Sequence, residues 1–148
     1  PRSTLFPYTT LFRSLFIIGQ AVLPALAAAE DLAPLGIDAA VVNARFVKPL
    51  DKELLRGVLH IVSHVITVED HAICGGFGSA VLEFLAEEDI TGVHLRCLGV
   101  PDRFIPHGTQ DELRKLCGFD RESITQAALQ MMRLGRKRTR EGWERGSA

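Results

Sequence analysis

Short apolar runs alternate along the chain with segments whose apolar residues recur every three or four positions. The runs at residues 15–18, 37–44, 64–70 and 92–100 have the length and composition of strands. The periodic segments are predicted helices at residues 22–35, 51–59, 75–89 (including an initial glycine turn), 109–117 and 120–132. This alternation predicts an α/β fold of three layers, in which helices cover both faces of a mainly parallel sheet of four visible strands.

Residues that favour helix ends support these boundaries. Asp51, Thr109 and Asp120 each stand at the start of a predicted helix, where a side-chain oxygen can accept from a free amide. Gly36 follows the first helix, where a left-handed residue commonly ends the helical turn. We therefore expect one domain over residues 15–132, a size that allows a real hydrophobic core.

The first 14 residues, PRSTLFPYTTLFRS, fit neither pattern. They contain no acidic residue, and Pro7 interrupts any strand or helix period. The segment lacks the apolar core of a secretory signal, and a transit peptide is the weaker alternative. It resembles the conceptual translation of a sequencing adapter. We therefore expect a non-native leader whose Phe6, Tyr8 and Phe12 stay out of the core, with natural protein upstream of Leu15.

Charge and composition narrow the class of partner. The chain is 47% hydrophobic and 24% charged with a net charge of −1, which is ordinary for a globular domain. No apolar run approaches the roughly 20 residues of a membrane span. Residues 15–132 hold nine basic and 16 acidic residues, whereas residues 133–148 hold six basic and two acidic ones. We expect a solvated, flexible basic tail, with neither nucleic acid nor membrane as a partner.

Three cysteines, Cys74, Cys97 and Cys117, are too few and too widely spaced for a disulfide framework. A reducing compartment such as the cytoplasm is the expected location. His71 and Cys74 form an isolated HxxC, which lacks the three or four ligands of a zinc site. The sequence therefore predicts no metal site.

A glycine-rich stretch, GGFGS, lies between the third strand and its helix. It matches neither the dinucleotide GxGxxG pattern nor a Walker loop. The favoured interpretation is structural: Gly75, Gly76 and Gly78 let the chain turn tightly and let the helix approach the sheet, with at least one positive φ. The alternative is that the free amides of the helix face an anion or a partner domain.

Glu69, Asp70 and His71 follow one another at the carboxyl end of the third strand, where open α/β sheets bind ligands. A histidine beside two acids could provide general acid–base chemistry. The favoured alternative is a structural ion cluster at a domain boundary. No nucleophile elbow, HExxH motif or phosphate loop accompanies them, so no catalytic or cofactor-binding residue is assigned.

Three stretches together resemble a known family. NARFVKPLD, VEDHAICGGFGSAVLEFL and LGVPDRFIPHGTQDEL are similar, in order and spacing, to the C-terminal domain of 1-deoxy-D-xylulose-5-phosphate synthases, which belong to the transketolase superfamily. The resemblance covers roughly Leu15 to Met132. His71, Cys74 and Pro106 differ from the residues usual in that family. These differences leave the order and spacing of the three stretches unchanged.

The resemblance implies a fold with a particular strand order. Its sheet has five strands, of which the first is an antiparallel edge strand that would lie upstream of Leu15 and is missing here. The remaining four would lie in the order 2-1-3-4. Gly19 and Gln20 would then line one crevice together with Glu69, Asp70 and His71, at the switch point of the sheet.

The resemblance also implies a function for the parent enzyme. Such synthases condense pyruvate with glyceraldehyde 3-phosphate in isoprenoid, thiamine and pyridoxal biosynthesis, as homodimers that use thiamine diphosphate and magnesium. The catalytic and cofactor-binding motifs, including a GDG…N metal motif, belong to upstream domains and have no counterpart here. We therefore expect an inactive fragment that serves assembly with those missing domains. The alternatives are a stand-alone binding or regulatory module and the matching domain of a 2-oxoacid dehydrogenase β subunit.

Overall fold

The computed structural model describes residues 13–18 and 21–144, with side chains over residues 21–132. The predictions for the rest of the leader and for Gly19 and Gln20 fall outside these ranges. The strands are β1 (Arg13–Ile18), β2 (Ala39–Asn43), β3 (His64–Ala72) and β4 (His94–Val100). The helices are α1 (Val22–Leu32), the 3₁₀ helix η2 (Ala33–Leu35), α2 (Lys52–Leu59), α3 (Phe77–Glu87), α4 (Gln110–Cys117) and α5 (Arg121–Glu144).

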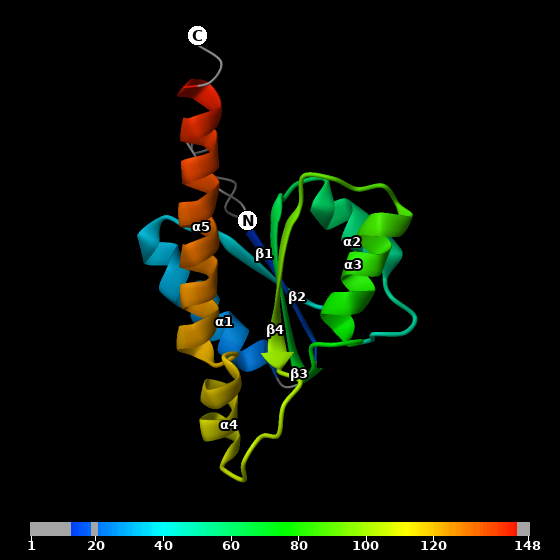
Figure 1. Ribbon diagram of the computed structural model, residues 1–148, viewed down its shortest axis with the longest axis vertical. Helices are drawn as coiled ribbons and strands as arrows, with labels where there is room; N and C mark the ends of the chain where they lie inside the picture. The colour runs from blue at the N-terminus through cyan, green and yellow to red at the C-terminus, as the bar shows by residue number, and fades with distance from the viewer. Residues whose placement is uncertain (1–12, 19–20, 145–148) are drawn as a thin grey trace, which may run out of the picture.

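The strands form a parallel sheet in the order β2-β1-β3-β4, the order that the family resemblance implies. Figure 1 shows α1 and α5 on one face of this sheet and α2 and α3 on the other. The sheet is therefore the middle layer of three. The direction of strand addition reverses between β1 and β3, which places the switch point there.

Alternate residues of β3 supply the two halves of the core. Ile66 and Val68 are buried in the cluster beneath α1 and α5. Val65 is buried in the cluster beneath α2 and α3, together with Phe77 and Phe84 of α3. Because β3 is covered on both sides, its residues from His64 to Glu69 are all buried rather than alternately exposed.

The predicted helix caps are present. Asp51 accepts from the amide of Leu54 at 3.0 Å, and Asp120 accepts from the amide of Ser123 at 3.2 Å. Thr109 and Glu112 form a reciprocal capping box at the start of α4. The Thr109 amide and hydroxyl both donate to the Glu112 carboxylate and lower its pKa. Local side-chain chemistry thus sets three of the helix starts.

Several element boundaries differ from the sequence prediction by a few residues, and two of these differences have a clear cause. β1 begins at Arg13 rather than Leu15, because Ser14 finds backbone partners on both sides, Ala40 of β2 and Val65 of β3. The last helix does not end near Met132 but continues to Glu144. Residues 133–144, expected to be a flexible tail, contain no proline and many good helix formers, so the helical backbone continues through them.

Charged pairs join helices on each face. Arg56 of α2 donates from Nε and Nη2 to the two carboxylate oxygens of Glu88, at 2.9 and 2.7 Å. These hydrogen bonds hold the pKa of Glu88 below its ordinary value. On the other face, Arg121 of α5 donates from Nε to Asp31 Oδ2 at 2.6 Å and also donates from Nη2 to Oδ1. Hydrogen bonding to this guanidinium likewise lowers the pKa of Asp31.

Candidate functional site

A buried carboxylate holds the N-terminus of α3. Glu69, near the end of β3, is 1% exposed. Its Oε2 accepts from the Phe77 amide at 2.7 Å, and its Oε1 accepts from the Gly78 amide at 3.0 Å. The N-cap residue, Gly76, makes no side-chain cap hydrogen bond, so Glu69 supplies the cap from another element. The two amides that could have faced an external anion are therefore bonded to the protein's own carboxylate.

The three glycines of GGFGS serve different geometric needs. Gly75 has φ of +73°, the positive φ that the turn prediction requires. A Cβ on Gly76 would collide with the Glu69 carboxylate and the Ala72 carbonyl oxygen. A Cβ on Gly78 would lie 2.5 Å from Cys97 Sγ and 2.8 Å from Thr67 Oγ1. The first glycine makes the turn, and the other two let α3 approach the sheet.

The turn that precedes α3 is closed by its own serine. Ser79 Oγ donates to the Ile73 carbonyl oxygen at 3.1 Å and accepts from the Gly75 amide at 3.0 Å. Cys74 lies exposed at this turn. These contacts fix the loop locally, so the predicted structural role of GGFGS has a specific geometry.

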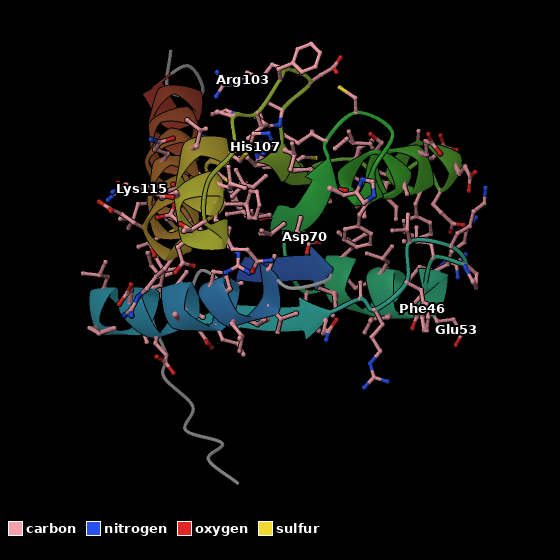
Figure 2. All side chains as sticks on the ribbon, turned by 90° about the horizontal axis from the view of Figure 1, so that it is seen from below. Phe46, Glu53, Asp70, Arg103, His107 and Lys115 are labelled. Atoms are coloured by element: carbon pink, nitrogen blue, oxygen red, sulfur yellow. The ribbon has the colours of Figure 1, made fainter. Side chains whose placement is uncertain are left out.

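The structure separates the acidic residues that the sequence analysis placed in one crevice. Because successive strand residues point to opposite faces, Glu69 faces α3, whereas Asp70 lines a cavity of about 310 Å³ together with α4. Figure 2 shows Asp70 near the middle of this end of the molecule. His71 is exposed, and its Nδ1 accepts from the adjacent Ala72 amide at 3.0 Å. The expected convergence of Glu69 with Asp70 is therefore wrong.

One residue of this site escaped the sequence analysis. A Cβ on Gly99 of β4 would lie 2.8 Å from both Cγ and the carbonyl oxygen of Glu69. Gly99 therefore makes room for the buried carboxylate from the neighbouring strand. The available signal was a glycine inside an apolar strand run, which often marks a close approach of other backbone or side-chain atoms.

The chemistry open to this arrangement is limited. The Glu69 carboxylate is shielded from solvent and already holds two amides, which suits a structural acceptor more than a proton-transfer group. Within residues 13–18 and 21–144, no three His, Cys, Asp or Glu side chains are grouped as ligands for a metal ion.

Comparison with known proteins identifies the family. Residues 14–124 match the family described as "Transketolase, C-terminal domain". The chain belongs to the transketolase C-terminal domain family. Among its relatives is the 1-deoxy-D-xylulose-5-phosphate synthase of Halothermothrix orenii, 48% identical over 115 residues that make up 78% of this chain and 18% of that protein.

Two further synthases show the same coverage. The synthase of Aquifex aeolicus is 51% identical over 119 residues, 80% of this chain and 19% of that protein. Synthase 1 of Geobacter metallireducens is 53% identical over 112 residues, 76% of this chain and 18% of that protein. The chain therefore spans about a fifth of the length of these transketolase-type relatives.

Solved structures agree on the fold. A split-gene transketolase, solved as an inactive β4 tetramer, matches with a TM-score of 0.74 and 32% identity, over 82% of this chain and 39% of that one. A transketolase from Campylobacter jejuni matches with a TM-score of 0.55 and 18% identity, over 82% of this chain and 17% of that one, which speaks to the fold alone. No helix in the described ranges is both long and apolar enough to cross a membrane.

Proposed function

We propose that this chain is the C-terminal domain of a 1-deoxy-D-xylulose-5-phosphate synthase and that the domain serves assembly of the enzyme rather than its chemistry. The observation that carries the proposal is the identity of 48–53% to three such synthases over only 18–19% of their length. In this proposal, upstream domains of the same polypeptide hold thiamine diphosphate and magnesium. The parent enzyme is a cytoplasmic homodimer that condenses pyruvate with glyceraldehyde 3-phosphate.

The chemistry of the GGFGS region supports an assembly role. Its buried carboxylate and close-packed glycines build a rigid corner between β3 and α3 rather than an open site. That corner carries the exposed segment from Asp70 to Cys74, with Ile73 half-buried. A rigid, solvent-facing loop on a packed scaffold suits contact with another domain.

Exposed apolar side chains also support contact with missing domains. Phe104 is fully exposed on the loop after β4, and Phe46 is 65% exposed on the loop after β2. Figure 2 shows Phe46 well apart from the loop that carries Arg103 and His107, so these are two separate surfaces rather than one patch. We assign both to contacts with upstream domains, and we assign the outer edge of β2 to the antiparallel strand of the family fold.

A chimaera tests this proposal. Residues 15–132 would replace the matching segment of the Aquifex aeolicus synthase, with the same synthase lacking that segment as the control. We expect the chimaera to form dimers and to make product, and the truncated control to do neither. The 148-residue chain alone, given thiamine diphosphate and magnesium, should show no turnover. Turnover by this chain alone, or full activity of the truncated synthase, would overturn the proposal.

A further inference from the structure

The loop after β2 exposes two kinds of side chain in four consecutive residues, called the 45–48 loop here. Arg45 and Lys48 are exposed cations, and Phe46 and Val47 between them are 65% and 40% exposed. Figure 2 shows Phe46 on the same side of the molecule as Glu53 of α2. Neighbouring apolar side chains with a charged rim are typical of a surface that another protein covers.

The body of the domain holds this loop in place. Ala44 and Leu50, which flank it, pack against the core cluster beneath α2 and α3. The Arg45 amide donates to Asn43 Oδ1 at 3.2 Å, and the Phe46 amide donates to the Ala44 carbonyl oxygen at 2.6 Å. Because both ends and two amides are fixed, the loop presents its side chains without first being ordered by a partner.

The two cations of the loop are not neutralised by the domain itself. Among the side chains that the structure describes, neither Arg45 nor Lys48 forms an ion pair. The nearest acid along the chain, Asp51, instead accepts from the Leu54 amide at the start of α2. A covering surface therefore has to supply negative charge of its own, because a desolvated cation without a partner is costly.

The overall charge of the domain restricts the kind of acidic partner. Residues 15–132 hold nine basic and 16 acidic residues, so a uniformly anionic surface such as a lipid bilayer or nucleic acid would repel most of the domain. A second copy that placed an acidic face on this loop would make a head-to-tail contact, which leaves the same surfaces open at each end. A protein surface with a few local carboxylates avoids both problems.

The length of the relatives indicates where such a surface lies. This chain matches only 18–19% of three synthases, so more than four fifths of each relative lies outside the match. A domain of the same polypeptide is held close by its linker, which raises its effective concentration at the loop. An intramolecular partner therefore needs less contact area than a separate protein would.

We propose that the 45–48 loop docks on an upstream domain of the parent polypeptide, in an apolar socket that receives Phe46 and Val47 and is flanked by carboxylates that pair with Arg45 and Lys48. This inference rests on the assembly role proposed above and adds the chemistry of one contact. Burial of the apolar pair supplies attraction, and the charge pairs fix the orientation of the docked domain.

Zero-length cross-linking of the chimaera with the Aquifex aeolicus synthase tests the contact without a variant. A carbodiimide joins a lysine amine to a carboxylate only where the two touch. We expect mass spectrometry to find Lys48 joined to an Asp or Glu outside the transplanted residues 15–132. A Lys48 joined only to residues within that segment, of its own or of a second copy, would overturn the inference, as would no cross-link. A dimeric, active chimaera without this cross-link would still support the assembly role, so the two failures are distinguishable.

Hydrogen exchange of charge-reversal variants tests the same contact independently. In the chimaera, a peptide covering residues 43–50 should exchange at least about tenfold more slowly than in the dilute 148-residue chain. Arg45→Glu/Lys48→Glu should remove this protection, yet leave the urea midpoint of the isolated chain unchanged. Lys115→Glu, at an exposed cation of α4, is the control and should keep the protection. Absence of protection in the unmodified chimaera, or protection that survives the double variant, would overturn the inference.

A lipid surface gives a different result. The 148-residue chain should not sediment with phosphatidylglycerol vesicles, because the acidic body of the domain opposes binding. Co-sedimentation that Arg45→Glu/Lys48→Glu abolishes and Lys115→Glu preserves would assign the 45–48 loop to a membrane and overturn the proposal.

Discussion

The carboxylate of Glu69 and the amide of Phe77 are 2.7 Å apart, although eight residues separate them along the chain. This contact joins the end of β3 to the start of α3, and a second bond to the Gly78 amide makes it bidentate. Because the carboxylate is buried, water cannot take its place. Its removal would therefore leave two buried amides without a hydrogen-bond acceptor. The corner that displays the loop from Asp70 to Cys74 depends on it.

Loss of this carboxylate should destabilise the domain strongly. Glu69→Gln leaves one acceptor oxygen but directs an NH₂ group toward an amide donor. We expect a fall of about 2–4 kcal/mol in the free energy of unfolding, given roughly 1.5–3 kcal/mol for each hydrogen bond to a charged group. Urea denaturation measures this change in the free energy of unfolding. Glu83→Gln, on the exposed side of α3, is the matched control and should change stability by less than about 0.5 kcal/mol.

Alanine substitutions should rank the glycines by their surroundings. Gly75→Ala meets only the cost of a positive φ, about 1 kcal/mol, since a Cβ there has open space. Gly76→Ala and Gly78→Ala should cost more, because their methyl groups would collide with Glu69 and Cys97. Gly57→Ala, within α2 and with open space, should instead stabilise by about 0.5–1 kcal/mol. Equal costs at all four positions would contradict the close-packing explanation.

The ion pair between α1 and α5 should give the domain part of its acid sensitivity. The pKa of Asp31 is lowered by its hydrogen bonds from Arg121. A lowered folded-state pKa adds stability above the ordinary value of 3.8 and loses it as the pH falls through the folded value. Asp31→Asn should therefore flatten the decline in urea midpoint between about pH 5 and pH 2. If the urea midpoint of Asp31→Asn declined as steeply as that of the wild type, the ion pair would not be a source of acid sensitivity. The same conclusion would follow if Asp38→Asn flattened the decline equally.

The exposed phenylalanines should make the isolated chain associate. Burial of apolar surface contributes about 25 cal/mol per Å², and Phe46 and Phe104 are exposed in the isolated chain. At about 100 μM, sedimentation should show self-association that the Phe46→Ser/Phe104→Ser double variant reduces. Ile61→Ser, at an exposed residue after α2, controls for general polarity. A clean wild-type monomer would favour a stand-alone module over an assembly domain.

Much of the fold follows from local signals. The apolar runs gave the strands of the sheet, and Asp51, Thr109 and Asp120 marked helix starts because capping depends on residues only three positions apart. The end of α5 could not be predicted from the spacing of apolar residues, because that spacing is lost after Met132, where the core ends. The helix continues because the residues that follow still favour helix. The start of β1 was missed because pairing with two neighbouring strands extends it beyond its apolar run.

The candidate site was harder to predict. GGFGS indicated a turn correctly, but nothing local shows that Glu69 reaches the α3 amides or that Gly99 makes room for it. The first contact depends on how the turn after β3 brings α3 back to the strand. The second depends on the pairing of β3 with β4. Neither is encoded by a single segment. Adjacent carboxylates also suggested one acidic site, although strand alternation sends Glu69 and Asp70 to opposite faces.

The central claim, that this domain supports assembly and not chemistry, is tested most directly in the chimaera with the Aquifex aeolicus synthase. The Asp70→Asn/His71→Asn double variant replaces the two exposed side chains at the end of β3 that could transfer a proton with amides that cannot. With dimer formation verified, we predict a kcat within about twofold of the unmodified chimaera. Loss of general acid–base catalysis commonly lowers the rate by about 10²–10⁴-fold, and a fall of that size in an intact dimer would contradict the account.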